Sequence, residues 1–150
     1  LLETLNEAGL NVEYSQNVFE SVWNKVALNS VLNTYCTLID CNIREYGQYP
    51  HNRILTEAVV NEVYAVGKAE GINLNKEKII KKIEAVFDPS KAGEHYPSLY
   101  QDMAKGRPTE IDYLNGAIVR LGKKHGIPTP VCEVITHMIK AKEHVKGIKA

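Results

Sequence analysis

The sequence has no excess of either charge, no long apolar run and few cysteines, and each absence excludes a class of protein. Its 150 residues contain 18 Lys+Arg and 18 Asp+Glu, so the basic surface of a nucleic-acid-binding module is not expected. No apolar run approaches the ~18 residues that span a bilayer, so we expect no membrane partner. Three cysteines without paired spacing argue against a disulfide scaffold or a zinc site and fit a reducing cytoplasm.

Two motifs for binding ligands are also missing from the sequence. Neither G-x-G-x-x-G nor G-x-x-x-x-G-K-[ST] occurs, so the chain has no phosphate-binding loop of its own. The five histidines form no H-x-x-x-H pair and no H-E-x-x-H motif, so we expect no metal site.

The first 16 residues differ in pattern from the rest of the chain. They predict a helix, a turn at Gly9 and a short strand at about 12–15, and one strand cannot form a sheet. We therefore expect residues 1–16 to be the remnant of an α/β domain whose remainder is absent. Because an unpaired strand edge recruits other strands, this segment either packs on the helical body or pairs two copies into a homodimer.

From residue 17 onward the hydrophobic periodicity is helical, and no convincing strand follows. Asn75 is the expected cap of one helix, Gly126 ends another, and a proline-containing connector precedes the last. The sequence therefore predicts an all-α domain of five to seven helices over residues 17–150. The helices are expected at about residues 17–39, 50–71, 75–87, 98–106, 110–125 and 131–145.

Three polar residues interrupt the apolar helix that begins near residue 18. Lys25, Asn29 and Asn33 are spaced i, i+4, i+8 and so form one stripe along the helix. The helix is otherwise apolar nearly all round, which predicts that it is buried. A buried, unpaired ammonium or amide costs on the order of several kcal/mol. The stripe therefore faces either solvent, as a polar seam, or a ligand, with a lysine proton donor and two amide clamps.

A second region with candidate functional residues follows residue 95. Ser98 opens a short amphipathic helix, where a serine usually serves as the N-cap. Glu110 falls in the first turn of the next predicted helix, where a carboxylate suits the helix dipole. Both residues thus have a structural and a functional interpretation, and their spacing does not separate the two.

Three motifs in order resemble one family, the ketopantoate reductases (2-dehydropantoate 2-reductases), over about residues 1–140. Residues 23–33 resemble its W-x-K-x-x-x-N-x-x-x-N helix, residues 98–116 its S-x-x-x-D…T-E-I-D-x-x-N-G segment, and residues 122–130 its A-x-x-x-G-I-P-x-P close. The resemblance implies an N-terminal Rossmann domain that holds NADPH and an all-α C-terminal domain similar to that of 6-phosphogluconate dehydrogenases. This chain would be the C-terminal domain, with most cofactor contacts in the absent part.

The resemblance also implies a reaction and a role for each candidate residue. The reaction is the NADPH-dependent reduction of the 2-keto acid ketopantoate to pantoate, in pantothenate and coenzyme A synthesis. Lys25 matches the general acid, while Asn29 and Asn33 match amides that hold the substrate. Ser98 matches a hydroxyl that binds the substrate carboxylate, and Glu110 matches an acid that contacts the lysine or the cofactor ribose.

Two alternatives remain open at the level of sequence. Ile43, next to Asn42, stands where some family members have a further substrate-binding asparagine, which allows a different 2-keto acid as substrate. The other alternative is a helical interaction or dimerisation module without chemistry. A buried Lys25 with its asparagine stripe favours the enzyme, because interface cores prefer aromatic residues and arginine.

Overall fold

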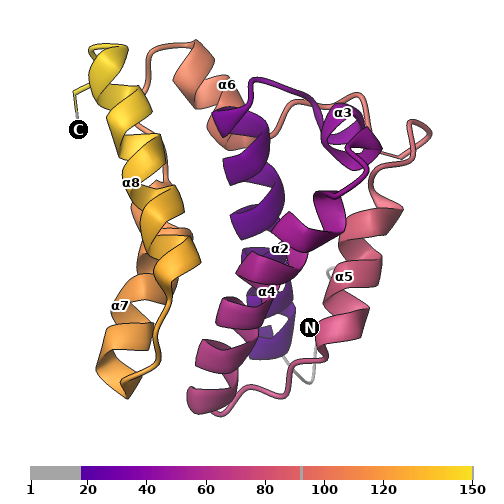
Figure 1. Ribbon diagram of the computed structural model, residues 1–150, viewed down its shortest axis with the longest axis vertical. Helices are drawn as coiled ribbons and strands as arrows, with labels where there is room; N and C mark the ends of the chain where they lie inside the picture. The colour runs from indigo at the N-terminus through magenta and orange to yellow at the C-terminus, as the bar shows by residue number, and fades with distance from the viewer. Residues whose placement is uncertain (1–17, 92, 150) are drawn as a thin grey trace, which may run out of the picture.

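The computed structural model describes residues 18–91 and 93–149, and these form a helical body without strands (Figure 1). The predicted all-α fold is therefore confirmed. The predicted strand at 12–15 and the boundary at residue 16 lie outside the described residues. The elements are α2 (Val18–Leu38), α3 (Ile43–Gln48), α4 (Asn52–Ala69), α5 (Lys76–Ala85), α6 (Ser98–Ala104), the 3-10 helix η1 (Ile111–Tyr113), α7 (Asn115–His125) and α8 (Pro130–Val145).

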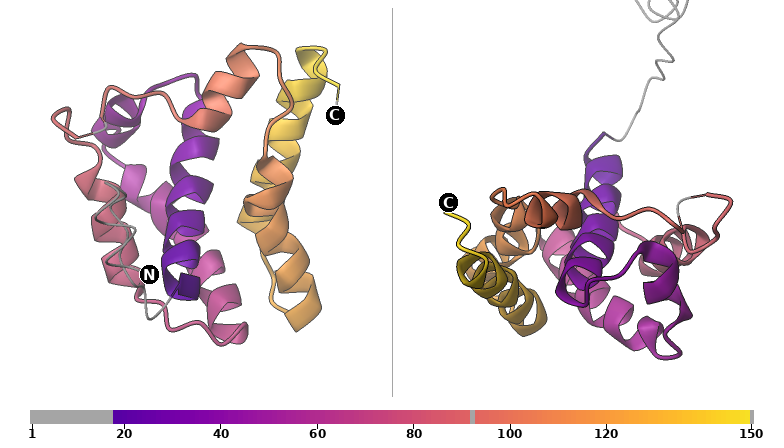
Figure 2. Two further views of the ribbon diagram at one scale, coloured as in Figure 1. Left: turned by 180° about the vertical axis from the view of Figure 1, so that it is seen from behind. Right: turned by 90° about the horizontal axis from the view of Figure 1, so that it is seen from above.

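Helix α2 is the centre of the arrangement, because it contacts α3, α4, α5, α6 and α8. Helices α7 and α8 form a pair on one side of it, and α5 lies on the opposite side, as the front and back views agree (Figure 2). Helix α4 contacts α5 as well as α7 and α8, and so joins the two sides. None of the described helices has the length and apolar character needed to cross a membrane.

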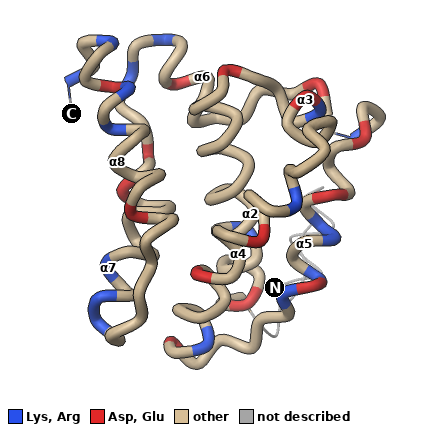
Figure 3. The backbone as a smooth tube through the Cα atoms, in the orientation of Figure 1, with Lys and Arg blue, Asp and Glu red and all other residues tan. Residues whose placement is uncertain are grey.

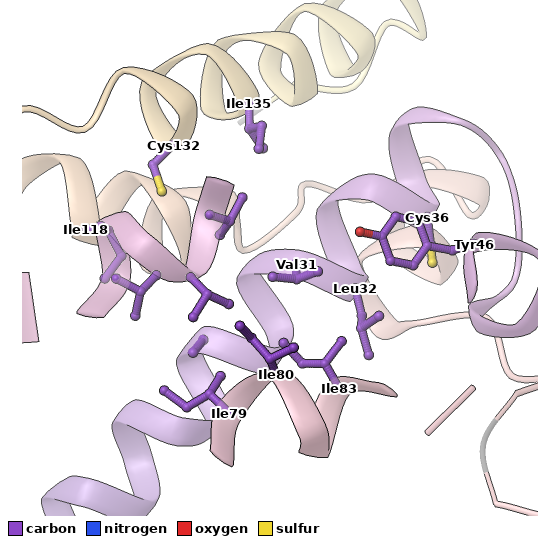
Figure 4. Packing of buried hydrophobic residues seen from close by; sticks show 14 of the residues in the cluster. Val31, Leu32, Cys36, Tyr46, Ile79, Ile80, Ile83, Ile118, Cys132 and Ile135 are labelled. Atoms are coloured by element: carbon purple, nitrogen blue, oxygen red, sulfur yellow. The ribbon is translucent and has the colours of Figure 1, made fainter. Parts of the chain in front are cut away.

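The main hydrophobic core lies where these helices meet (Figure 4). Val31 of α2, Ile80 of α5, Ile118 of α7 and Ile135 of α8 are all buried in it. Full burial of one such side chain stabilises the fold by about 1.5–3 kcal/mol. The core therefore fixes α2 in place from Ala27 onward, which is where the burial of this helix begins.

Local signals explain several helix ends, as the sequence predicts. The Asn75 side chain accepts a hydrogen bond from the backbone N–H of Lys78 at 2.8 Å and so caps α5. Helix α7 ends at Gly126, whose φ of +66° is in the left-handed region that glycine adopts without strain. Both ends follow from the residue type at the cap position.

The start of α8 is capped by a residue from another helix. Glu62 of α4 is 9% exposed, and its two carboxylate oxygens accept the backbone N–H groups of Val131 and Cys132, each at 2.8 Å. The N-cap residue itself, Thr129, makes no side-chain cap hydrogen bond. Glu62 thus supplies a negative charge and two acceptors where a helix has unpaired donors and positive dipole.

Charged residues of both signs are scattered along the helices (Figure 3). Arg53 of α4 contacts Glu57 on its own helix and both Glu77 and Glu84 of α5. Each contact is largely exposed and contributes little on its own, about 0–1 kcal/mol. Together they connect α4 to α5 on the side away from α7 and α8.

Two details differ from the predicted elements. Helix α3 was not predicted, although its capping box is in the sequence: Asn42 accepts from the N–H of Glu45, and the Glu45 carboxylate accepts from the N–H of Asn42. The continuous helix predicted over 110–125 is wrong, because η1 is followed by a break at Leu114 with φ −103° and ψ −105°. A 3-10 turn places residues i and i+3 on the same side. Ile111 and Leu114 can therefore both reach the same small apolar cluster.

Candidate active site

A pocket of about 490 Å³ beside α2 brings together all five predicted site residues. Lys25, Asn29 and Asn33 come from α2, Ser98 from the first residue of α6, and Glu110 from the residue before η1. Small-molecule sites in proteins typically have volumes of about 300–1,000 Å³. The polar stripe on α2 therefore faces a cavity of suitable size for a small ligand.

The stripe runs from the open mouth of the pocket to a buried end. Lys25 is exposed, Asn29 is half-buried, and Asn33 is only 5% exposed. The prediction that this helix is buried nearly all round, with Lys25 inside, is wrong. Phe19 and Val22, in the first turns of α2, are more than half exposed, and full burial in this helix begins only at Ala27.

The exposed Ser98 meets the buried Asn33 in the pocket. The Asn33 amide Nδ2 donates a hydrogen bond to Ser98 Oγ at 3.3 Å. The structural interpretation of Ser98 as an N-cap is wrong, since Pro97 holds that position and no side-chain cap bond is present. A hydroxyl and an amide are thus held next to each other as neutral donors and acceptors for a ligand.

A small apolar cluster holds both Ser98 and Glu110 against the rest of the fold. Leu99 directly follows Ser98 and is fully buried, and Ile111 directly follows Glu110 and is almost fully buried. At each of these two positions an exposed polar residue of the pocket is followed directly by a buried apolar residue. The packing of the apolar residue therefore holds the polar one in place. The cluster also contains Met103, Leu114 and Ile139.

The pocket wall also includes Ile43, which stands where some family members have a substrate-binding asparagine, and His95, to which the sequence pattern gives no role. Two backbone hydrogen bonds bring them together: the N–H of Ile43 donates to the carbonyl of His95 at 3.2 Å, and that of Arg44 to the carbonyl of Gly93 at 2.6 Å. His95 lies in a loop, where no periodicity indicates which way a side chain points. Its position three residues before Ser98 is the only signal in the sequence.

The pocket is lined by three titratable groups: the Lys25 ammonium, the Glu110 carboxylate and the His95 imidazole. No group of three or more His, Cys, Asp or Glu residues that could hold a metal occurs in the described part of the chain. The Cys36 and Cys132 thiols lie in the core instead, where burial raises their pKa and makes them poor nucleophiles. The pocket therefore offers a proton donor and several hydrogen-bond donors.

The fold and the pocket define the class of the chain, an all-α domain with a pocket of small-ligand size along one central helix. Residues 17–143 match the model of a family described as ketopantoate reductase PanE/ApbA C terminal. The chain belongs to this family, as the three motifs predict.

Individual relatives agree with this assignment. The 2-dehydropantoate 2-reductase of Lactococcus lactis subsp. lactis is 42% identical over 150 residues, which cover 99% of this chain and 48% of the relative. A solved PanE/ApbA family ketopantoate reductase from Ralstonia eutropha is 29% identical with a TM-score of 0.87, over 97% of this chain and 48% of that one. A D-mandelate dehydrogenase, solved with NADH and anilino(oxo)acetate, is 41% identical with a TM-score of 0.90. This match covers 98% of this chain and 80% of the dehydrogenase chain. The chain spans about half the length of the curated relatives it matches.

Proposed function

We propose that this chain is the C-terminal, substrate-binding half of an NADPH-dependent 2-dehydropantoate 2-reductase, which reduces ketopantoate to pantoate for coenzyme A synthesis. The observation that carries the proposal is the single pocket that brings together Lys25, Asn29, Asn33, Ser98 and Glu110. The family and the names of the relatives support the reaction type. A match that begins at residue 17 supports the boundary between residues 1–16, assigned to a Rossmann domain, and the helical domain.

Lys25 is the proposed general acid. A nicotinamide cofactor, when bound, would supply a hydride to the keto carbon, and the negative charge that develops on the ketone oxygen would need a proton. The Lys25 ammonium donates this proton, so that the product is the neutral alcohol of a 2-hydroxy acid. Because Lys25 lies at the exposed mouth of the pocket, the resulting amine can regain its proton from solvent after product release.

The other residues hold the substrate and the lysine. Asn29, Asn33 and Ser98 donate neutral hydrogen bonds to the substrate oxygens, with Ser98 at the carboxylate. Glu110 orients Lys25 or contacts the cofactor ribose. The pocket has room for a keto acid and the reacting end of the cofactor, but the chain has no phosphate loop, so most of the cofactor is assigned to the Rossmann domain.

The assay that tests the proposal uses the full-length protein that carries this chain. NADPH oxidation is followed at 340 nm with a panel of 2-keto acids. Lys25→Met keeps the aliphatic stem, and we expect it to lower kcat by about 10²–10⁴-fold, which general acid catalysis typically contributes. The matched control is Lys68→Met, an exposed lysine at the end of α4, which leaves kcat unchanged. A loss below tenfold for Lys25→Met would show that another group donates the proton.

A second candidate function is the reduction of another 2-keto acid, one with an apolar side chain. Ile43, 6% exposed, lines the pocket where some family members have a substrate-binding asparagine. The similarity to D-mandelate dehydrogenase, whose name indicates an aromatic 2-hydroxy acid, points the same way. The ratio of kcat/KM for ketopantoate and benzoylformate decides between the two candidates. If the protein reduces no 2-keto acid of the panel, the remaining candidate is a non-catalytic interaction module.

We also propose a cytoplasmic location. All three cysteines are free and buried in the described part of the chain, which fits a reducing compartment.

A further inference from the structure

His95 lines the proposed active site without a role in the reaction described above. Its loop is held at two points by the backbone hydrogen bonds from Ile43 and Arg44 to residues 95 and 93. The buried Pro97 follows two residues later and leads directly into α6. The loop is therefore anchored on both sides of His95, and this residue, although exposed, lines the pocket from an anchored backbone.

The residues assigned so far do not compensate the negative charge of the substrate carboxylate. A 2-keto acid brings a carboxylate into a pocket that is lined by one basic and one acidic side chain, Lys25 and Glu110. The proposed mechanism uses the Lys25 ammonium at the ketone oxygen. Ser98 and Asn33 are neutral, so they bind the carboxylate without compensating its charge.

His95 is the remaining titratable residue among those that line the pocket, and it stands three residues before Ser98. An imidazole donates an N–H hydrogen bond in its neutral form and two in its charged form. Hydrogen bonds that involve a charged partner, such as a carboxylate, are about twice as strong as neutral ones. An imidazole in the same pocket wall as Ser98 can therefore complete the recognition of the carboxylate.

We propose that His95 is a substrate-recognition residue, which binds the carboxylate of the 2-keto acid together with Ser98. This inference rests on the proposed reductase function and deepens it. It assigns the carboxylate to the end of the pocket formed by the 93–98 loop, and it makes the anionic group a requirement for tight binding. Neutral analogues of the substrate then lose the contribution of His95.

The test compares acid and ester substrates in the full-length protein. The variants are His95→Phe, which keeps a ring without an N–H donor, and His95→Gln, which keeps a donor. The substrates are benzoylformate and its neutral methyl ester, or ketopantoate and its neutral lactone, whichever acid has the higher kcat/KM. The control is His137→Phe, an exposed histidine on α8 outside the pocket.

For His95→Phe we expect KM for the acid to rise about 10- to 100-fold, the loss expected for one charge-assisted hydrogen bond. KM for the neutral substrate stays within about twofold and kcat changes little, since the contact forms before the transition state. His95→Gln restores part of the affinity for the acid. His137→Phe leaves both substrates unchanged.

Equal changes for acid and neutral substrate, or an unchanged KM for the acid, would overturn the role of His95. If His95→Phe does not fold, as judged by circular dichroism, His95→Ala takes its place in the same comparison. An unaltered protein that reduces no 2-keto acid would instead overturn the proposed function. The two failures are therefore distinguishable by the activity of the unaltered protein.

Discussion

The cap that Glu62 places on α8 gives a stability prediction that does not depend on the function. In Glu62→Gln the side chain keeps its size and one carbonyl oxygen. The second carboxylate oxygen is replaced by an amide NH₂ group, which cannot accept a hydrogen bond. One of the two backbone N–H groups, that of Val131 or that of Cys132, therefore loses its acceptor inside the fold. The substitution also removes the negative charge from the N-terminus of α8.

The magnitude follows from these two losses. A hydrogen bond to a charged group contributes about 1.5–3 kcal/mol, and a charge at a helix terminus about 0.3–1 kcal/mol. We therefore expect the free energy of unfolding to fall by about 2–4 kcal/mol, out of the roughly 5–15 kcal/mol typical of a domain. For a chain of this length, the same change lowers Tm by about 5–15 °C.

The assay is urea unfolding of the chain followed by circular dichroism of the helices. The control is Glu57→Gln on the same helix, whose side chain is 42% exposed and pairs with Arg53 on the surface. Surface pairs contribute about 0–1 kcal/mol, so this variant stays close to the unaltered chain. If Glu62→Gln lowers the free energy of unfolding no more than Glu57→Gln does, the carboxylate does not cap α8 as described.

Three further predictions concern the chain itself. Alone, it does not oxidise NADPH with any 2-keto acid, because recognition of the cofactor phosphates requires a glycine-rich turn that it lacks; measurable turnover by the purified chain would contradict this. If the segment 1–16 pairs two copies, light scattering detects a homodimer that removal of this segment abolishes; identical masses with and without it would refute the pairing. Hydrogen bonds from Lys124 and His125 lower the pKa of Glu70 below its ordinary 4.5. These two hydrogen bonds therefore stabilise the fold above that pH, and the stabilisation is lost as the pH falls below it. Glu70→Gln removes this contribution, so the difference in Tm between pH 7 and acid pH is smaller in the variant than in the unaltered chain.

Those parts of the fold that depend on local chemistry were predictable from the sequence. The cap at Asn75 and the end of α7 at Gly126 each follow from one residue type at one position. The start of helix α3 was also predictable, since Asn42 and Glu45 have the spacing of a capping box. Its six residues are too few for a periodicity to be recognised.

Other parts depend on contacts between distant segments, which no local pattern contains. The spacing of Lys25, Asn29 and Asn33 predicts their common face, but not that burial begins only at Ala27 and leaves Lys25 exposed. At the break after η1, Leu114 packs into a cluster with residues of α6 and α8, a contact between distant segments that no local pattern contains.

The role of His95 in the pocket wall has the same kind of origin. Backbone hydrogen bonds to the residues that begin α3 place it there, and these join segments about 50 positions apart in the sequence.

Ile43 belongs to two structures at once, since it packs in the main core and also lines the pocket. A mutation at this position therefore changes the pocket wall and the core together. Asparagine there would bring an amide against apolar neighbours, at a cost of about 1–3 kcal/mol wherever it lacks a partner. A lineage could acquire a new substrate through this residue only if it already had spare stability, or after a compensating change elsewhere in the core. The order in which mutations can accumulate is thus constrained by a single side chain.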